Sequence, residues 1–179
     1  MENIKIYLLC GKARTGKNTV GRIIKEELEN TNHKVCEIQI MRTLKGYIKD
    51  YFNWDGNEDT KPRKLLQQLG YDVIREKLGL ENFHIDRLTE DIKILSNYFD
   101  TFIVSDVRLP HEIEEIKNRF NNTVSINIVK DNYISPLDKE EANHITETAL
   151  DNYDNFDYKI INNDIEEVRK NIVSILGGK

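Results

Sequence analysis

The sequence predicts a three-layer α/β fold in which a five-stranded parallel sheet is covered by helices on both faces. Short apolar runs alternate along the chain with segments of helical periodicity, a pattern typical of right-handed β–α–β crossovers. The apolar runs are nearly continuous, as expected for strands buried on both faces. A glycine-rich turn joins the first apolar run to the first helical segment.

Five apolar runs are the strand candidates. They cover residues 4–10, 35–41, 101–105, 123–129 and 158–161.

Helical periodicity fills most of the chain between these runs. Residues 17–30 place Val20, Ile23, Ile24 and Leu28 on one face. A second helix is expected to open at Thr60, as its cap, with Pro62 in the first turn. Further helices are expected over residues 85–99, after Pro110, and over residues 165–176.

Composition limits the possible functions. A chain of 179 residues with 39% hydrophobic content suits one domain, expected over residues 1–179. The formal net charge of -5 argues against a general nucleic-acid binder. No run of about 18 apolar residues is present, so we expect no membrane span. The first ten residues are too short and too charged for a signal peptide, which favours the cytoplasm. A monomer and a homodimer both remain open.

Two polar stretches interrupt the pattern and are expected to be loops. One covers residues 53–60, and the other covers residues 131–143 and contains Pro136. Loops of this kind over a parallel sheet often form lids and acceptor sites.

The glycine-rich turn has the spacing Gly-x4-Gly-Lys directly after an apolar run and before a helix, which is typical of a P-loop. Its glycines let backbone N–H groups surround phosphate oxygens, and the helix N-terminus adds positive potential. Lys17, on an exposed loop, would reach the β- and γ-phosphates, and Thr19 the α-phosphate. The predicted nucleotide-binding residues are Gly11, Lys12, Ala13, Arg14, Thr15, Gly16, Lys17, Asn18 and Thr19.

The predicted ligand is ATP with Mg²⁺. Asn18 stands where a serine or threonine usually binds magnesium, and its amide oxygen is a weaker ligand. Asp106 ends the third apolar run, a position where a carboxylate holds magnesium or its water. Arg108 follows and would stabilise charge on the transferring phosphoryl group. We therefore predict Lys17, Asp106 and Arg108 as catalytic residues, with Asn18 and Asp106 at the metal.

With these motifs placed, the chain resembles the bacteriophage-type and bacterial deoxynucleoside monophosphate kinases, within the wider P-loop nucleotide kinases. That family typically reads Gly-Lys-Asp-Thr-Val where this chain has an asparagine in place of the aspartate. The resemblance implies a small α/β kinase that transfers phosphate from ATP to a nucleoside monophosphate, a small-molecule acceptor. The four segments that carry it are residues 11–20, 61–75, 105–112 and 144–162.

The second of these segments supports an acceptor site within a helical region of about residues 42–99. Arg63 and Gln67 are four residues apart and share a helix face. Arginine suits phosphate binding and an amide suits a base edge. Lys45 and Arg75 are further candidates for acceptor binding.

Two signals concern a lid near residues 131–143. Kinase lids often carry arginine, but this stretch contains Lys139 and no arginine. His144 and Glu147 are interpreted as the start of a helix capped by Asn143, and the resemblance adds a possible role near the lid. Asn162 and Asn163 could line the adenine pocket.

Two alternatives stay open at this point. One is a related small-molecule kinase that acts on dephospho-coenzyme A or phosphomevalonate. The other is a nucleotide-binding regulatory protein without catalysis, which Asn18 and the arginine-poor lid would fit.

Overall fold

The computed structural model describes residues 4–177, so the first three residues of the N-terminal segment interpreted above lie outside it. It contains a five-stranded parallel sheet, as predicted, and the strands lie in the order β2-β3-β1-β4-β5. The strands are β1 (Lys5–Cys10), β2 (Val35–Ile38), β3 (Thr101–Val107), β4 (Thr123–Val129) and β5 (Tyr158–Ile161).

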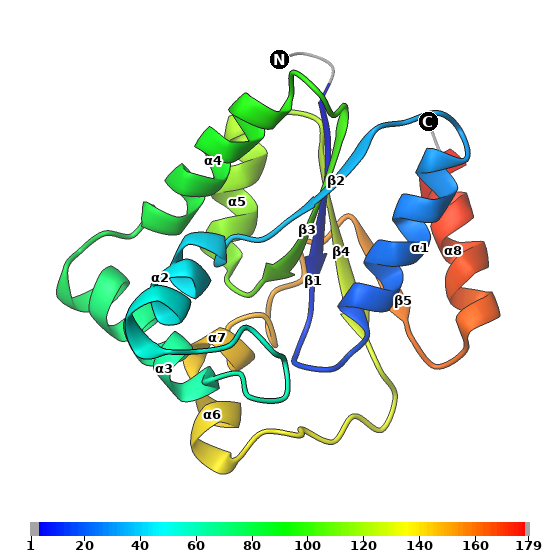
Figure 1. The fold of residues 1–179 in the computed structure, drawn as a ribbon. Helices are drawn as coiled ribbons and strands as arrows, with labels where there is room; N and C mark the ends of the chain where they lie inside the picture. Colours follow the sequence, from blue (N-terminus) through cyan, green and yellow to red (C-terminus); the bar gives the residue numbers. More distant parts are fainter. Residues whose placement is uncertain (1–3, 178–179) are drawn as a thin grey trace.

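Helices cover both faces of the sheet, which confirms the three-layer prediction (Figure 1). One face carries α1 (Lys17–Glu29) and α8 (Ile165–Gly177), and the other carries α4 (Phe83–Leu95) and α5 (Pro110–Arg119). The remaining helices lie toward the carboxyl ends of the strands. They are α2 (Arg42–Phe52), α3 (Arg63–Gln67), η1 (Gln68–Lys77, a π-helix), α6 (Lys139–Asn143) and α7 (Ile145–Thr148).

The central strand β1 contributes to two separate cores because its side chains alternate between the faces of the sheet. Ile6 and Leu8 pack in the cluster that also holds residues of α4 and α5. Tyr7 and Leu9 pack in the cluster formed with α1 and α8. Ile6, Leu8 and Leu9 are fully buried, so β1 and the loop that follows it are held rigidly from both sides.

The region between β2 and β3 forms a third, smaller core. Leu44 and Ile48 of α2 are completely buried and pack with Ile74 of η1. The sequence analysis included residues 42–52 in a helical region of about residues 42–99 but gave no bounds for a helix there, although this apolar pair, four residues apart, is a helical signal. The platform of α2, α3 and η1 lies beside the carboxyl ends of the strands.

Several predicted boundaries were wrong for local reasons. Thr60 caps no helix; its hydroxyl donates to Asp55, and α3 begins after Pro62. The predicted loop over residues 131–143 ends in α6, because the Asp138 side chain accepts from the N–H of Glu141 and caps that helix.

Two further findings concern the helices. The last predicted helix agrees with α8. Within residues 4–177, no helix is long and apolar enough to cross a membrane.

Candidate active site

The turn over residues 11–17, which we call the phosphate loop after its predicted role, connects β1 to α1. Gly11 and Gly16 have φ values of +136° and +98°, a region that side chains disfavour. A Cβ atom on Gly16 would lie 1.8 Å from Nδ2 of Asn162. That nitrogen donates to the carbonyl oxygen of Thr15 over 2.8 Å. The end of β5 therefore supports the loop through the Asn162 side chain.

Lys17 lies inside the phosphate loop rather than exposed on it. Its Nζ donates to the carbonyl oxygens of Gly11 over 2.8 Å and Lys12 over 2.6 Å, and the residue is 8% exposed. Burial, and then the Arg108 guanidinium, lower the pKa of Lys17 to about 7, against an opposing effect of the Glu147 carboxylate. An anion bound in the loop would favour the charged ammonium again.

Asp106 lies near the end of β3, at the carboxyl edge of the sheet, and its side chain bonds to the backbone that follows β2. Its carboxylate accepts from the backbone N–H of Ile40 over 2.8 Å and of Met41 over 3.3 Å. These bonds draw the chain out of the sheet, which is why β2 ends before the predicted boundary at residue 41. Nζ of Lys45 lies 3.5 Å from the same carboxylate.

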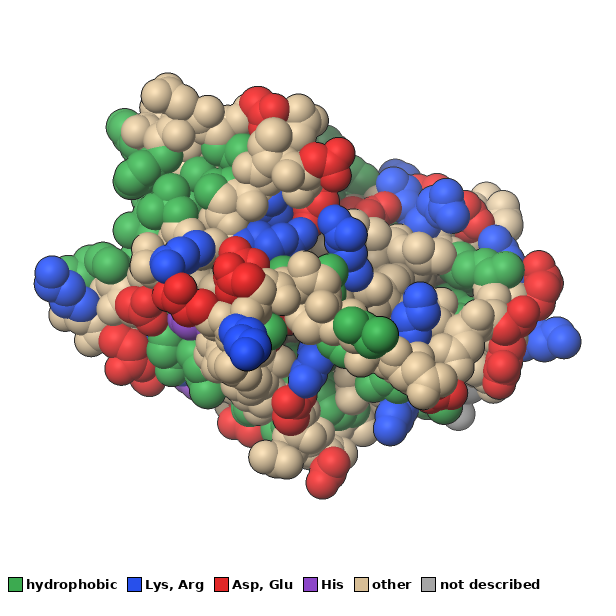
Figure 2. Space-filling view, turned by 90° about the horizontal axis from the view of Figure 1, so that it is seen from below, with side chains coloured by type: hydrophobic (Ala, Val, Ile, Leu, Met, Phe, Trp, Pro, Cys, Tyr) green, Lys and Arg blue, Asp and Glu red, His purple; other side chains and the backbone are tan. Residues whose placement is uncertain are grey.

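A cavity of about 260 Å³ separates the phosphate loop from the start of α3, and we call it the basic cleft. Two carboxylates, Glu58 and Asp106, face a larger number of cations in its lining. Figure 2, which views this face of the molecule, shows Lys and Arg side chains gathered near its centre. Such a site suits a ligand with several negative charges. Its six cationic side chains are Arg14, Lys17, Lys45, Lys61, Arg63 and Arg108.

The two predicted metal ligands, Asn18 and Asp106, both line the basic cleft. Across the part of the chain that the structure describes, no cluster of three or more His, Cys, Asp or Glu side chains could hold a metal ion without other ligands. A cation here would need oxygens from a bound phosphate and from water, as magnesium at nucleotide sites does.

A second cavity of about 110 Å³, the inner pocket, adjoins the basic cleft. The two share Lys45, Lys61, Arg63, Asp106 and Arg108, so they form one continuous surface. The inner pocket adds an apolar wall, made of Met41, Leu44, Leu66 and Leu137.

The structure places the predicted acceptor residues in different environments. Arg63 borders both cavities, and its Nη2 lies 2.6 Å from Oε1 of Glu58. Gln67 lines the inner pocket, but its amide nitrogen donates to the carbonyl oxygen of Glu141. Arg75 borders neither cavity. It lines a recess of about 40 Å³ behind the inner pocket.

Glu147 lies between the phosphate loop and Arg108, and its side chain is 9% exposed. Its Oε2 accepts from the N–H of Ala13 over 3.1 Å and from Nη1 of Arg108 over 2.9 Å. The sequence analysis placed Glu147 in a first helical turn and offered only a role near the lid. Residue spacing could not reveal this contact, because Ala13 and Glu147 are 134 positions apart.

The expected cap at Asn143 was wrong. Asn143 is the last residue of α6, and the cap of α7 is His144, whose Nδ1 accepts from the N–H of Thr146. The physical reason is the backbone of His144, which is extended (φ -62°, ψ 145°) and starts a new helix.

Glu112 is a buried residue that the sequence analysis did not single out. Its Oε2 accepts from the N–H groups of Arg108 over 2.7 Å and Leu109 over 3.0 Å. Burial raises the pKa of Glu112 to about 7. The signal was present, since a proline at the first helical position with a glutamate two residues later is typical of a helix start. Glu112 fixes the backbone of Arg108 at the edge of the cleft.

Residues 39–172 match the protein family described as deoxynucleotide monophosphate kinase. This chain belongs to that family. The matched range contains the platform of α2, α3 and η1 together with Asp106, Arg108 and Glu147, and it begins after the phosphate loop. Membership in this kinase family makes the protein a phosphotransferase. No curated protein sequence matches the chain.

Solved structures support the same fold at low sequence identity. The shikimate kinase from Bacteroides thetaiotaomicron has a TM-score of 0.53 at 16% identity, with 96% of this chain and 98% of that chain covered. A mutant of the APS kinase CysC from Mycobacterium tuberculosis has a TM-score of 0.52 at 12% identity, with 98% and 99% covered. Both comparisons show that this chain shares its α/β fold with these two kinases.

Proposed function

We propose that this protein transfers the terminal phosphoryl group of ATP to a nucleoside monophosphate, deoxynucleotides included, and so produces two diphosphates. The observation that carries the proposal is the continuous cationic surface from the phosphate loop to α3. In this proposal Lys17, in the basic cleft, and Arg108 serve the donor, and Arg63 serves the acceptor; Arg108 and Arg63 border both cavities. The apolar wall of the inner pocket, next to these cations, suits a base and a sugar.

The reaction needs little covalent chemistry from the protein. An oxygen of the acceptor phosphate attacks the γ-phosphorus of ATP, the bond from that phosphorus to the β,γ-bridging oxygen breaks, and ADP leaves with the bridging oxygen. Lys17 and Arg108 would stabilise charge on the transferring group. Arg63, Lys61 and Lys45 would hold the acceptor phosphate and offset the repulsion between the two anions.

The residues at the cleft fit a magnesium ion. Each oxygen of Asp106 accepts one backbone hydrogen bond and keeps a lone pair, and the exposed amide of Asn18 borders the same cavity. Magnesium usually keeps several waters and takes one or two protein ligands. When bound with ATP, the ion neutralises charge on the β- and γ-phosphates.

Residues 1–179 are proposed to act as one kinase domain in the cytoplasm. In this proposal, residues of about 42–99 bind the acceptor and the segment after β4 forms the lid. Cys10 and Cys36 are both free thiols, as expected in a reducing compartment.

The test is ADP release from ATP in the presence of each deoxynucleoside and ribonucleoside monophosphate in turn. Dephospho-coenzyme A and phosphomevalonate are included as acceptors outside this class. We expect turnover with at least one monophosphate and none with the other two compounds. ATP binding without ADP release on any acceptor would instead support a regulatory protein, and release only with the other two compounds would reassign the acceptor.

A further inference from the structure

Glu147 joins the two halves of the donor site through one oxygen atom. Its Oε2 lies 3.1 Å from the backbone nitrogen of Ala13, in the phosphate loop, and 2.9 Å from Nη1 of Arg108, beyond β3. The Glu147 side chain is 9% exposed and that of Arg108 is 19% exposed, so water screens this ion pair poorly. A charge-assisted hydrogen bond in such a place is stronger than one on the surface.

The segment that carries Glu147 is attached to the phosphate loop at two further points. We call residues 131–151 the lid; they comprise the stretch of residues 131–143, interpreted above as a lid, and the segment with α7 that follows it. The hydroxyl of Tyr133 donates to the carbonyl oxygen of Ala13 over 2.9 Å. Nζ of Lys12 lies 2.8 Å from the carboxylate of Asp151. These contacts hold the lid against the loop on both sides of Glu147.

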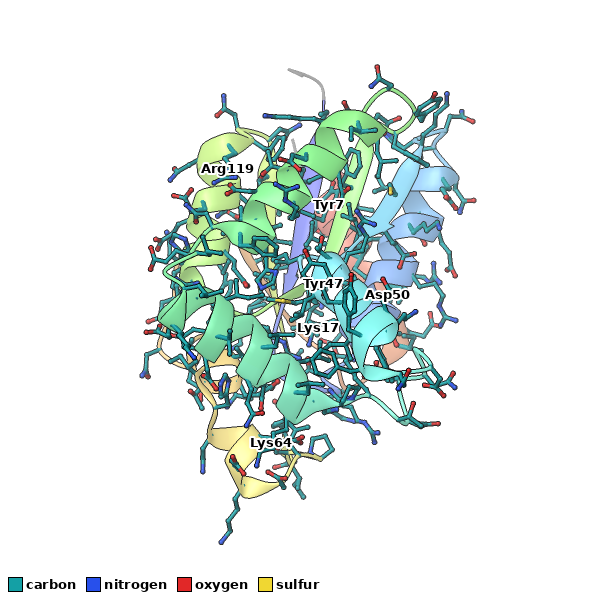
Figure 3. All side chains as sticks on the ribbon, turned by 60° about the vertical axis from the view of Figure 1, so that its left-hand side comes forward. Tyr7, Lys17, Tyr47, Asp50, Lys64 and Arg119 are labelled. Atoms are coloured by element: carbon teal, nitrogen blue, oxygen red, sulfur yellow. The ribbon has the colours of Figure 1, made fainter. Side chains whose placement is uncertain are left out.

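The lid is attached to the acceptor side as well. Lys64 of α3 pairs with Glu140 over 2.7 Å, and the amide of Gln67 donates to the carbonyl oxygen of Glu141. Figure 3 shows Lys64 next to the lid helices, and Lys17 near the centre of the molecule. The lid therefore spans the phosphate loop and α3, and Glu147 lies at its contact with the loop.

We propose that Glu147 is a positioning residue, which aims the Arg108 guanidinium at the transferring phosphoryl group and fixes it to the phosphate loop. This inference rests on the proposed phosphoryl transfer. Between residues 131 and 151 the lid contains no arginine. In this arrangement the lid supplies a carboxylate, and the arginine comes from the edge of the sheet.

Two features of the site agree with this role. Glu112 fixes only the backbone of Arg108, so the direction of the side chain depends on other contacts. The second is the contact itself, since Oε2 of Glu147 accepts from Nη1 of Arg108. Lys17 and Arg108 are both cationic and line the same cleft, so removal of the Glu147 carboxylate would leave them repelling each other, and Arg108 would turn away.

The experiment compares E147Q with the wild type, with R108A and with the double variant E147Q/R108A. We expect E147Q to lower kcat by about 10- to 100-fold, the range that one charge-assisted hydrogen bond is worth. KM for ATP and for the monophosphate should change less than about threefold. The double variant should be no slower than R108A, because both changes remove the same interaction. E140Q, which alters the exposed lid carboxylate that pairs with Lys64, is the matched comparison and should lower kcat far less than E147Q does.

A second readout is independent of turnover. The affinity for ADP with aluminium fluoride and the monophosphate, a mimic of the transferring state, should fall in E147Q, while the affinity for ADP alone stays unchanged. Tighter ATP binding in E147Q would show that Glu147 is an internal competitor and would overturn the inference, as would additive losses in the double variant. If E147Q does not fold, E147D supports the same comparison. A wild type without turnover would refute the proposed function, and the affinity readout would still decide the role of Glu147.

Discussion

Nζ of Lys17 donates a hydrogen bond to the carbonyl oxygen of Gly11 over 2.8 Å, so the lysine closes the phosphate loop onto itself. The ammonium group therefore takes part in the architecture of the loop. It is also the cation that a bound triphosphate would contact. Loss of the first role should lower the stability of the loop, and loss of the second should lower the rate of phosphoryl transfer.

Lys17→Ala should reduce phosphoryl transfer by about 10²–10³-fold, because a preorganised charge is lost at the transition state. Steady-state ADP release measures this. The loop also loses two hydrogen bonds, so we expect a lower Tm while the circular dichroism spectrum stays native. Lys17→Arg keeps the positive charge but changes the shape of the side chain, so it separates the effect of shape from the effect of charge. Near-normal turnover in Lys17→Ala would refute the nucleotide role of the loop.

ATP binding should take up a proton above neutral pH. The pKa of Lys17 is lowered to about 7 by burial and by Arg108, so at pH 8 most unliganded molecules carry a neutral Lys17 amine. The phosphates of ATP favour the ammonium, and the affinity for ATP should therefore fall as pH rises above about 7. Calorimetry of ATP binding in buffers of different ionisation enthalpy measures the uptake. Lys17→Arg, which stays protonated, should lack it; equal uptake in that variant would assign the proton to another group.

Glu112 should make the protein less stable as pH rises from about 4.5 to 7. Burial raises the pKa of Glu112 from 4.5 to about 7, so in this window the folded state holds a proton that the unfolded state has released. Stability then falls with pH, by up to about 1.4 kcal/mol per pH unit. Urea unfolding at several pH values measures the slope. Glu112→Gln should flatten it, and an unchanged slope would exclude Glu112 as its source.

Much of the fold was readable from local pattern. The five strands and the phosphate loop follow from apolar runs and from Gly-x4-Gly-Lys, because burial on both faces leaves a continuous apolar signal. The predicted end of the second strand was wrong because a distant residue bonds to its backbone. The Asp106 carboxylate accepts hydrogen bonds from the N–H groups of Ile40 and Met41, and no pattern within residues 35–41 predicts these bonds.

The site was predictable only in part, for the same reason. Lys17, Asp106 and Arg63 lie at strand or helix ends, where spacing indicates a role, and they do border one cleft. Glu147 contacts the loop across 134 residues, so only the folded chain reveals it. Arg75 follows Arg63 in sequence, but π-helix η1 places it in a different recess.

Asp106→Asn should weaken the magnesium dependence of ATP binding. The carboxylate charge is lost, while the amide oxygen can still accept one of the two backbone bonds from Ile40 and Met41. We expect similar ATP affinity without magnesium and a much smaller gain when magnesium is added. Titrations of both proteins with and without the ion measure this. A magnesium effect as large as in the wild type would remove Asp106 from the metal site.

Arg63→Ala should raise KM for the monophosphate far more than KM for ATP. Lys17 and the phosphate loop account for the donor phosphates, so the acceptor phosphate needs cations from another element. Arg63 provides one, since it borders both the basic cleft and the inner pocket. Nη2 of Arg63 lies 2.6 Å from Oε1 of Glu58, and the acceptor phosphate would compete with that carboxylate for the guanidinium.

The comparison with Arg75→Ala makes this test selective. Arg75 lines the recess behind the inner pocket and lies 3.6 Å from Glu81, so its removal should raise KM for the monophosphate less than Arg63→Ala does. Arg63→Lys should restore binding only in part, because an ammonium cannot form the planar, two-point contact of a guanidinium with phosphate. Steady-state kinetics with each substrate varied separately would measure all three variants. Equal effects of Arg63→Ala on both substrates, or a larger effect of Arg75→Ala, would place the acceptor phosphate elsewhere.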